Sequence, residues 1–363
     1  MITFDSDFEN GSLDRAIKLG ENWYHLCLRP DTWYWFHCRI RGCKGKEIIF
    51  QFTCSPDIKS PGYEEGKGRW EFGEGVYNRP VVSYDKKAWE KVGRIEQDVQ
   101  LPGTFRFRQT FREDEAYICY SYPYTYSDLT AWLETLVGNP LVSREAIGKT
   151  RNGLDQPCLT LTANQETRDL VAIIAREDAD EVTTSFAVEG MVRVLLDEEP
   201  SWALDKYVFE IVPMVSIDGV VAGSTFSGGY GFHTARWQES PSPPEIENVK
   251  QAVAGWAAQG YRFVLAGKMH GGQCIPKPGS GHMDIRTNDP RLRDVLTSTV
   301  DEYYHPRAQD LSLGFPGRYE RYLYEEYGVR VTFSNHAQGE DPDGVRGYGR
   351  GLMRAILTYL SSA

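Results

Sequence analysis

The sequence lacks long apolar runs, and its first residues, MITFDSDFENG, are acidic. We therefore expect neither a membrane span nor a secretory signal, which needs a basic region followed by an apolar core. Positive charge is also scarce, because 40 Lys and Arg stand against 51 Asp and Glu, a net charge of −11. This balance argues against a nonspecific binder of nucleic acid or of anionic membrane.

Cysteine is scarce too. The seven cysteines are odd in number and form no CxxC pair. Reduced thiols in a cytoplasm fit this usage better than a disulfide framework does, so we expect a cytoplasmic protein. The hydrophobic content of 41% and the charged content of 25% are typical of a soluble globular protein. A chain of 363 residues is long enough for one large domain or two ordinary ones.

Two patterns of secondary structure divide the chain near residue 120. Short strands rich in aromatic residues come first, as at 104–111, where apolar and arginine positions alternate. They predict an antiparallel β-sandwich domain over residues 1–118, with aromatic side chains in its core and a sugar- or peptide-binding platform as the minority alternative. Strands then alternate with helices, so residues 119–363 are predicted to form an α/β domain, a mixed β-sheet flanked by helices on both faces.

An acidic cluster follows a predicted buried strand. Residues 171–175, VAIIA, are apolar on both alternations, as in a strand buried on both faces. Acidic residues crowd the next six positions before a helical spacing of apolar residues begins. In open α/β sheets, ligands bind at the carboxyl ends of the strands, so the cluster could form part of a binding site. The plainer alternative is an acidic first helical turn, which the helix dipole favours. Asp178 and Glu181 are three residues apart and can face the same way.

Two further strand ends carry polar residues. One predicted strand ends in His270 and is followed by two glycines, and another, at 212–220, runs into an Asp-Gly turn and a Gly/Ser loop. Asp178, Glu181 and His270 would together make a three-ligand zinc site with an open position for water. Two carboxylates and one imidazole also suit a harder ion such as manganese.

The order of these segments resembles that of the zinc carboxypeptidases, and most of all their cytosolic carboxypeptidase branch, which has a β-sandwich before the peptidase domain. The joining segment of that branch is similar to residues 119–129, CYSYPYTYSDL. The first metal motif of the family, Ala-Arg-x-His-Pro-Gly-Glu, is similar to residues 175–181. The match keeps the glutamate ligand as Glu181 and replaces the histidine ligand with Asp178, and Gly190 stands where the family has a glycine in the next helix.

Other matches and departures follow from the same resemblance. The His-Gly pair of the family is similar to His270-Gly271, and its Pro-x-x-Asn-Pro-Asp-Gly-Val to residues 213–220. The Asn-Arg pair that holds the C-terminal carboxylate of the substrate becomes Ala235-Arg236, which implies that Arg236 binds that carboxylate. The oxyanion-stabilising arginine has no clear match at 223–230.

The catalytic glutamate implied by the resemblance is also missing. The family carries it on the last strand in a Thr-x-Glu context, where this chain has Ser334 or Asn335. Glu340 is near in sequence, but only a loop rearrangement would deliver it to the site. A positioned general base is worth roughly 10²–10⁴ in rate, so its loss predicts weak activity.

Two hypotheses follow. The first is a diverged metal-dependent hydrolase of a peptide-like amide, with weak or altered activity, zinc as the cofactor and a substrate that has a free carboxylate. The second is a catalytically inactive peptidase-fold protein used for binding or assembly. Weaker alternatives are a nucleophile pair of Cys274 with His270 and a serine triad of Ser334 with His336. No nucleic-acid or membrane partner is expected.

Overall fold

The computed structural model describes most of the chain and divides it into two compact units. The described residues are 1–32, 35–53, 79–93, 95–97, 104–197, 202–225, 233, 236–271, 284–299, 308–310, 316–337 and 341–362. One unit comprises Met1–Pro123 and Val220–Thr225, and the other Tyr124–Gly219 and Phe226–Ala363. The boundary at 118/119 inferred from the sequence remains our proposal for where the domains divide.

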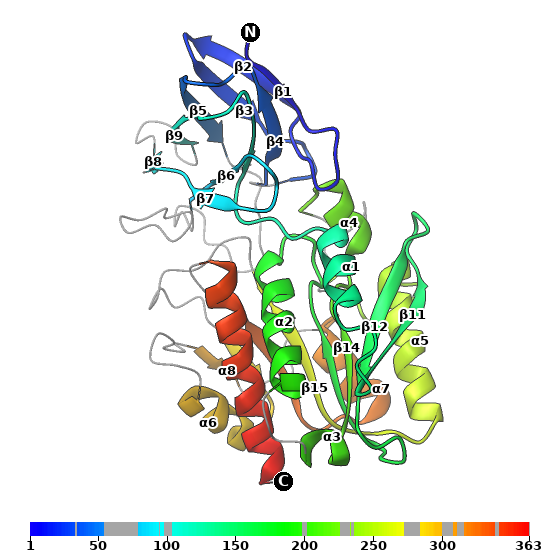
Figure 1. The fold of residues 1–363 in the computed structure, drawn as a ribbon. Helices are drawn as coiled ribbons and strands as arrows, with labels where there is room; N and C mark the ends of the chain where they lie inside the picture. The colour runs from blue at the N-terminus through cyan, green and yellow to red at the C-terminus, as the bar shows by residue number, and fades with distance from the viewer. Residues whose placement is uncertain are drawn as a thin grey trace. The chain divides into compact units, whose positions relative to one another are not determined.

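The first unit contains two five-stranded sheets (Figure 1). In order across the first sheet lie β1 (Thr3–Asp5), β4 (His37–Arg41), β10 (Glu115–Cys119), β6 (Val81–Ser83) and β7 (Trp89–Lys91). In order across the second lie β2 (Arg15–Gly20), β3 (Trp23–Cys27), β5 (Glu47–Thr53), β9 (Thr104–Thr110) and β8 (Ile95–Gln97). All strand pairs are antiparallel except β3 with β5, which is parallel. The predicted antiparallel sandwich is thus confirmed, with one parallel pair inside it.

Aromatic side chains form the core of this unit. Phe50 on β5 stacks on Phe107 of β9 with ring centroids 5.0 Å apart, and Phe36 packs on Phe52 at 5.1 Å. All four rings are buried. Burial of these rings stabilises the unit, because each removes a large apolar area from water.

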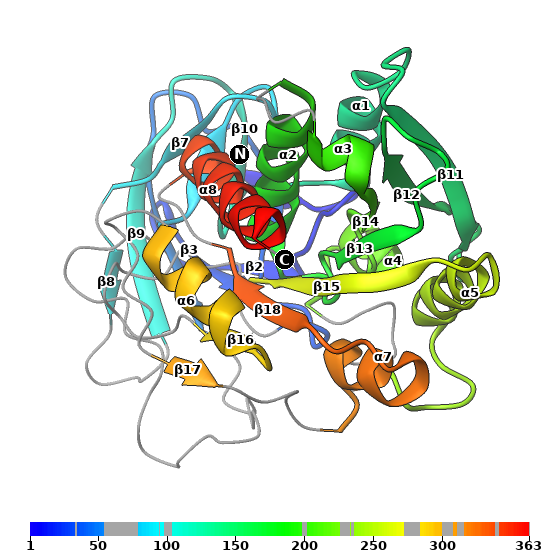
Figure 2. The ribbon, with the colours of Figure 1, turned by 90° about the horizontal axis from the view of Figure 1, so that it is seen from below.

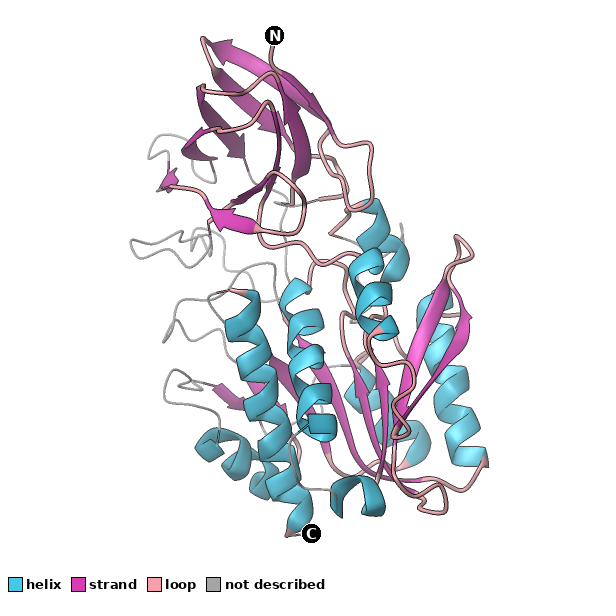
Figure 3. Ribbon diagram, in the orientation of Figure 1, coloured by secondary structure: helices cyan, strands magenta, loops and turns pink. Residues whose placement is uncertain are grey.

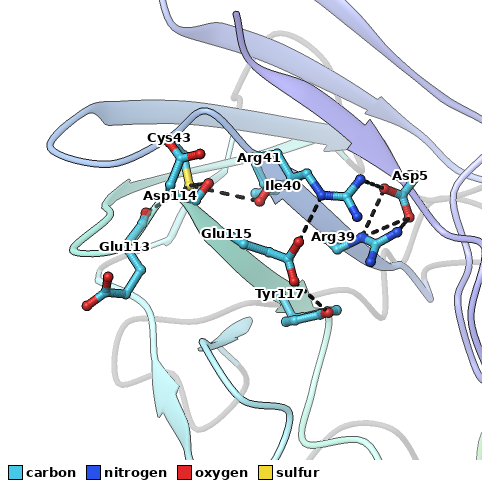
Figure 4. A network of polar contacts seen from close by, with 9 residues as sticks. All are labelled: Asp5, Arg39, Ile40, Arg41, Cys43, Glu113, Asp114, Glu115 and Tyr117. Atoms are coloured by element: carbon cyan, nitrogen blue, oxygen red, sulfur yellow. Dashed lines mark hydrogen bonds and ion pairs between the residues drawn. The ribbon is translucent and has the colours of Figure 1, made fainter.

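Charged side chains line the outer face of the first sheet (Figure 4). Asp5 on β1 accepts hydrogen bonds from Arg39 and Arg41 of β4 at 2.9–3.2 Å, and Arg41 donates to Glu115 of β10 at 2.8 Å. Tyr117 donates to the same Glu115 at 3.0 Å. These groups are partly exposed, so each pair contributes about 0–1 kcal/mol and mainly favours the correct strand register.

The segment Val220–Thr225 is held in the first unit by backbone groups. The Asn10 backbone N–H donates to the Val221 carbonyl at 2.9 Å, and its side-chain amide donates to the Val220 carbonyl at 2.8 Å. Gly223 has φ +64°, and a Cβ there would lie 2.6 Å from the Gly11 carbonyl oxygen. Only glycine fits this close approach in a left-handed conformation.

The second unit is built on an eight-stranded mixed sheet (Figure 3). In order across it lie β11 (Val142–Lys149), β12 (Asp155–Leu161), β14 (Val208–Val212), β13 (Asp169–Ile174), β15 (Arg262–His270), β18 (Thr332–His336), β16 (Asp284–Thr287) and β17 (Ala308–Asp310). The central strands β14, β13, β15 and β18 run parallel to one another. The strands at both sides of this group introduce antiparallel pairs.

Helices cover both faces of this sheet, as predicted (Figure 2). The helices are α1 (Tyr126–Glu134), α2 (Val182–Asp197), α3 (Trp202–Lys206), α4 (Ile217–Ala222), α5 (Pro244–Ala258), α6 (Pro290–Thr299), α7 (Tyr319–Tyr327) and α8 (Pro342–Ser361). Helices α2 and α8 lie on one face, and α5 and α7 on the other. The apolar residues of α5 and α7 pack on Leu170, Ala172 and Ile174 of β13. No described helix is long and apolar enough to cross a membrane.

Helices α2 and α8 approach each other closely at two glycines. A Cβ at Gly190 of α2 would lie 2.0 Å from the Arg346 carbonyl oxygen, and one at Gly349 of α8 would lie 2.0 Å from the Ala187 carbonyl oxygen. Both contacts are with backbone, which cannot move aside as a flexible side chain can. The glycine that the sequence places nine residues after Glu181 is therefore a helix-packing residue.

We predict that Gly349→Ala lowers the free energy of unfolding by about 1–3 kcal/mol, because the added methyl forces the two helices apart. Gly351→Ala in the same helix is the control, since a Cβ there meets nothing within 4 Å. Its better helix propensity is expected to leave stability unchanged or raise it by up to about 1 kcal/mol. Urea denaturation of the two variants beside the wild type measures both effects, and equal stability of the two variants would contradict this packing role.

A buried carboxyl group lies within the sheet, outside the site. Glu210 of β14 accepts hydrogen bonds from the Thr160 hydroxyl at 3.0 Å and from the Cys158 thiol at 3.3 Å. Burial raises the pKa of Glu210 to about 7, against those hydrogen bonds, which lower it. Between the ordinary pKa of 4.5 and about 7 the unfolded chain releases a proton that the folded chain retains. Stability therefore falls as pH rises through this window.

Glu210→Gln removes this titration while its amide oxygen still accepts both hydrogen bonds. We expect the variant to gain stability relative to the wild type as pH rises from 5 to 8, by up to about 3 kcal/mol. The exposed Glu134→Gln serves as the control and should show no such trend. Melting temperatures of all three proteins across this pH range measure the effect, and parallel curves for wild type and Glu210→Gln would refute it.

Candidate active site at the carboxyl ends of the parallel strands

The parallel register brings the predicted site residues to one edge of the sheet. β13 pairs with β15, with Ile174 opposite Lys268, and β15 pairs with β18, with Lys268 opposite Ser334. The carboxyl ends of the three strands therefore lie side by side, which is where open α/β sheets bind their ligands. Residues 175–181 follow β13 directly and lead into α2.

A hydrogen-bonded turn fixes the acidic stretch. Arg176 has φ +53°, an uncommon value for a residue with a side chain. Its backbone N–H donates to the Thr184 hydroxyl at 3.0 Å, which in turn donates to the Glu181 carbonyl at 2.7 Å. The Arg176 guanidinium is buried and donates to the Ala179 carbonyl at 2.9 Å. The turn is thus specified by side chains on the first turn of α2.

The structure brings Glu181 and His270 into direct contact. The Nδ1 atom of His270 meets the Oε1 atom of Glu181. The Asp178 backbone N–H donates to the other oxygen, Oε2, of Glu181 at 3.3 Å. Glu181 and Asp178 are buried, whereas 28% of the His270 side chain remains exposed, so the pair is open to solvent from the histidine side.

The Asp178 carboxylate is held by a backbone group. Its Oδ1 atom accepts a hydrogen bond from the His233 backbone N–H at 2.6 Å. Oxygen and imidazole donors of this kind suit zinc. Within the described part of the chain, however, no three His, Cys, Asp or Glu side chains form a group that could hold a metal ion. Two of the three predicted ligands thus converge, and the complete set of Asp178, Glu181 and His270 stays a prediction.

Burial, and then the neighbouring charges, shift the pKa values of these residues in opposite directions. Burial raises the pKa of Asp178 well above its usual range, and the neighbouring Glu181 and Glu177 raise it further. Burial raises the pKa of Glu181 to about 7, although Lys268 acts against this. Burial and then Lys268 hold the pKa of His270 well below its usual range. A lowered pKa favours the neutral imidazole, which is the form that a metal ligand needs.

A buried ion pair beside this site was not predicted. Lys268, near the end of β15, contacts the Oε2 atom of Glu177, and the Trp237 indole N–H contacts Oε1 of the same carboxylate. All three side chains are buried. Burial alone would lower the pKa of Lys268, but the Glu177 carboxylate raises it. The sequence signal that could have indicated this ion pair is a single lysine within an apolar strand. This lysine precedes His270 by two residues and therefore lies on the same face of the strand.

A second buried group supports the loop that holds Asp178. His233 places its Nε2 atom 3.7 Å from Oε2 of Glu245, and Oε1 of Glu245 accepts from the Asp218 backbone N–H at 3.1 Å. Asp218 also accepts from the Asn152 backbone N–H at 3.1 Å. Burial lowers the pKa of His233 to about 4 and raises that of Glu245 to about 7. Asp218 and Gly219, predicted from the sequence to form a turn, instead lie in the first turn of α4 and are part of this buried support.

Arg236 lies on the loop that follows α4. Its Nε atom donates to Glu239 at 2.8 Å, and 26% of its side chain is exposed. The described contacts of Arg236 therefore include an acidic neighbour, which a substrate carboxylate would have to displace or share. Binding of a substrate carboxylate by Arg236 stays a prediction.

The two candidate positions for the general base, Ser334 and Asn335, lie on opposite faces of the last strand, β18. Asn335 is buried, and its Oδ1 atom accepts a hydrogen bond from the Tyr348 hydroxyl of α8. Side chains alternate along a strand, so Ser334 lies on the other face, opposite Lys268 in the register. Of the two, Ser334 is the position on the side of the site. Glu340 and Cys274 lie outside the described residues.

The chain thus combines a β-sandwich unit with a mixed α/β unit that has carboxylate and imidazole groups near its strand ends. Two family models match parts of this chain and show its resemblance to the zinc carboxypeptidases. The family model described as zinc carboxypeptidase matches residues 129–251, and the model described as cytosolic carboxypeptidase N-terminal domain matches residues 4–121.

Named relatives agree with this family. Cytosolic carboxypeptidase 2 of Danio rerio is 28% identical over 254 residues, which cover 61% of this chain and 34% of the relative. Cytosolic carboxypeptidase 6 of Homo sapiens is 28% identical over 279 residues, which cover 69% of this chain and 53% of the relative. The chain thus spans about a third to a half of the length of these two relatives.

Solved structures share the fold over the whole chain. The metallo-carboxypeptidase from Burkholderia cenocepacia has a TM-score of 0.77 at 19% identity and covers 100% of both chains. The metallo-carboxypeptidase from Pseudomonas aeruginosa, solved in complex with (2-guanidinoethylmercapto)succinic acid, has a TM-score of 0.74 at 17% identity, with 99% of each chain covered. At these identities the likeness establishes the fold alone.

Proposed function

We propose that the protein is a metal-dependent hydrolase of a peptide-like amide, with activity weaker than an intact metallocarboxypeptidase site would give. The observation that carries this proposal is the contact between Glu181 and His270, one carboxylate and one neutral imidazole, from two parallel strand ends. These are the donors that a catalytic zinc site uses, and manganese suits the same set.

Each site residue has a role in this proposal. Glu181 and His270 hold the metal with Asp178 as the third ligand, and Arg236 binds the free carboxylate of the substrate. When bound, the metal supplies Lewis acidity and lowers the pKa of a coordinated water. The support behind Asp178, made by the His233 backbone, keeps the acidic turn in place. The low pKa of His270 favours an unprotonated ring nitrogen, which can bind the metal.

The second candidate is a catalytically inactive protein that uses the peptidase fold for binding or assembly. The observation in its favour comes from β18, where Asn335 is turned toward Tyr348 and Ser334 carries no carboxylate. A site without a positioned base loses about 10²–10⁴ in rate. The two candidates therefore differ in turnover and in metal content, both of which are measurable.

We also propose a cytoplasmic location. The relatives are named as cytosolic proteins, and the described cysteines are free thiols. Free thiols persist in a reducing compartment.

The first test of the hydrolase proposal is metal content. Full-length protein purified without chelator and dialysed after incubation with zinc chloride is expected to retain about one ion per chain. His270→Ala should abolish this retention, because it removes the one neutral ligand of the set. His25→Ala in the first unit is the matched control and should retain the metal.

Elemental analysis of the three proteins gives the result, and circular dichroism shows whether each is folded. Folded wild type that holds no zinc above the His270→Ala background would contradict the metal-dependent hydrolase and leave the binding protein as the better proposal.

The second test is turnover. We expect the metal-loaded wild type to release C-terminal residues from a peptide panel very slowly. Ser334→Glu should raise the rate, by up to about 10²–10⁴ if the new carboxylate is well positioned, because it lies on the side of Lys268. Asn335→Glu is the matched control and should gain nothing, since that side chain faces Tyr348.

Amino-acid release with and without chelator measures the effect. Rapid chelator-sensitive turnover by the wild type would show that another residue acts as base. Equal increases in rate for Ser334→Glu and Asn335→Glu would contradict the assignment of Ser334, and not Asn335, to the face of β18 on the side of the site.

A further inference from the structure

We propose that Lys268 sets how tightly this site binds a divalent cation, by placing a fixed positive charge among the carboxylates that the ion would use. The proposal rests on the proposed function, in that Glu181 and His270 are taken as ligands. It adds a second determinant of cation affinity besides the ligands, namely the buried ion pair of Lys268 with Glu177.

The geometry places Lys268 next to both predicted ligand segments. It lies two residues before His270 on β15, so both side chains leave the same face of the strand. Its ammonium contacts the carboxylate of Glu177, which directly precedes Asp178. The same carboxylate receives the Trp237 indole N–H, so Glu177 is held in position by two donors from different segments.

The charge count shows what the lysine does. The buried turn carries four carboxylates, those of Glu177, Asp178, Asp180 and Glu181, and two of them belong to the predicted ligands Asp178 and Glu181. The buried ammonium of Lys268 contacts one of them, Glu177. Arg176 is also buried, but its guanidinium donates to the Ala179 carbonyl at 2.9 Å and to the Ser185 hydroxyl at 3.1 Å. Lys268 therefore neutralises one carboxylate directly.

Burial makes this charge effective. Both Lys268 and Glu177 have no solvent-exposed side-chain surface. In the protein interior, charges act on each other more strongly than in water, and salt screens them less. A divalent cation held by Glu181 and His270 would be repelled by the ammonium, and it would compete with that ammonium for the same acidic turn. Loss of the positive charge should thus tighten cation binding, and loss of the Glu177 charge should weaken it.

The test compares charge at position 268 while retaining a donor to Glu177. Lys268→Gln removes the positive charge but keeps an N–H group, and Lys268→Arg is the matched control that keeps the charge. Isothermal titration of each full-length protein with zinc chloride and with manganese chloride at pH 7 gives the dissociation constants. Thermal melts followed by circular dichroism give the folding of each variant.

We expect Lys268→Gln to bind zinc at least about tenfold more tightly than the wild type, and Lys268→Arg to match the wild type within about threefold. Glu177→Gln, which leaves the ammonium uncompensated, should bind more weakly than the wild type. Folded Lys268→Gln with unchanged or weaker zinc binding would overturn the inference. If Lys268→Gln is unfolded without metal, zinc must restore its melting transition, and failure to do so would overturn the inference as well.

The outcomes for the two proposals are separable. Tight zinc binding by the wild type that Lys268→Gln does not change would support the metal site and overturn the role of Lys268. Binding that appears only in Lys268→Gln would support the role of Lys268 and overturn the proposal that the wild type is a metal-dependent hydrolase.

Discussion

Four acidic side chains in one buried turn must be compensated inside the protein, and the arrangement of the site depends on that constraint. Glu177, Asp178, Asp180 and Glu181 follow β13 within five residues, and all are buried. An uncompensated buried carboxylate is costly, so each needs an internal donor or a proton. Lys268 and the Trp237 indole serve Glu177, the His233 backbone serves Asp178, and His270 serves Glu181. Strand β15 and the loop after α4 are tied to the turn by these contacts.

The sequence is informative where a pattern is local. The apolar run 171–175 predicted a strand buried on both faces, and the structure has β13 there with helices packed on both sides. The position of Glu181 and His270 at neighbouring strand ends followed from the rule that parallel strands present their carboxyl ends together. The two side chains are in contact in the structure, and their role as metal ligands stays a prediction.

The remaining parts depend on pairings between distant residues. The ion pair of Lys268 with Glu177 joins two segments that each looked unremarkable, a lysine in an apolar strand and one acid among several. The choice between Ser334 and Asn335 needs the face that each residue presents, which became clear only from the contact of Asn335 with Tyr348. The hold of Asn10 on Val220–Thr225 likewise joins residues that no local pattern relates. The aromatic pattern of the first unit, by contrast, was sufficient to predict its sandwich.

Internal hydrogen bonds do not by themselves decide whether this site can accept a cation. Binding would replace the contact of Glu181 with His270, and a hydrogen bond to a charged group contributes only about 1.5–3 kcal/mol net. A structural zinc site can provide about 10–16 kcal/mol, several times that cost. Hydrogen bonds offset less easily the repulsion between a bound cation and a buried positive charge, because no water screens it. In the proposed site an ionised Asp178, where the resemblance implies a neutral histidine, would attract a cation, and Lys268 beside Glu177 would act in the opposite sense. If the proposed site binds an ion, we expect the balance between these two buried groups to matter more than the number of available ligand atoms.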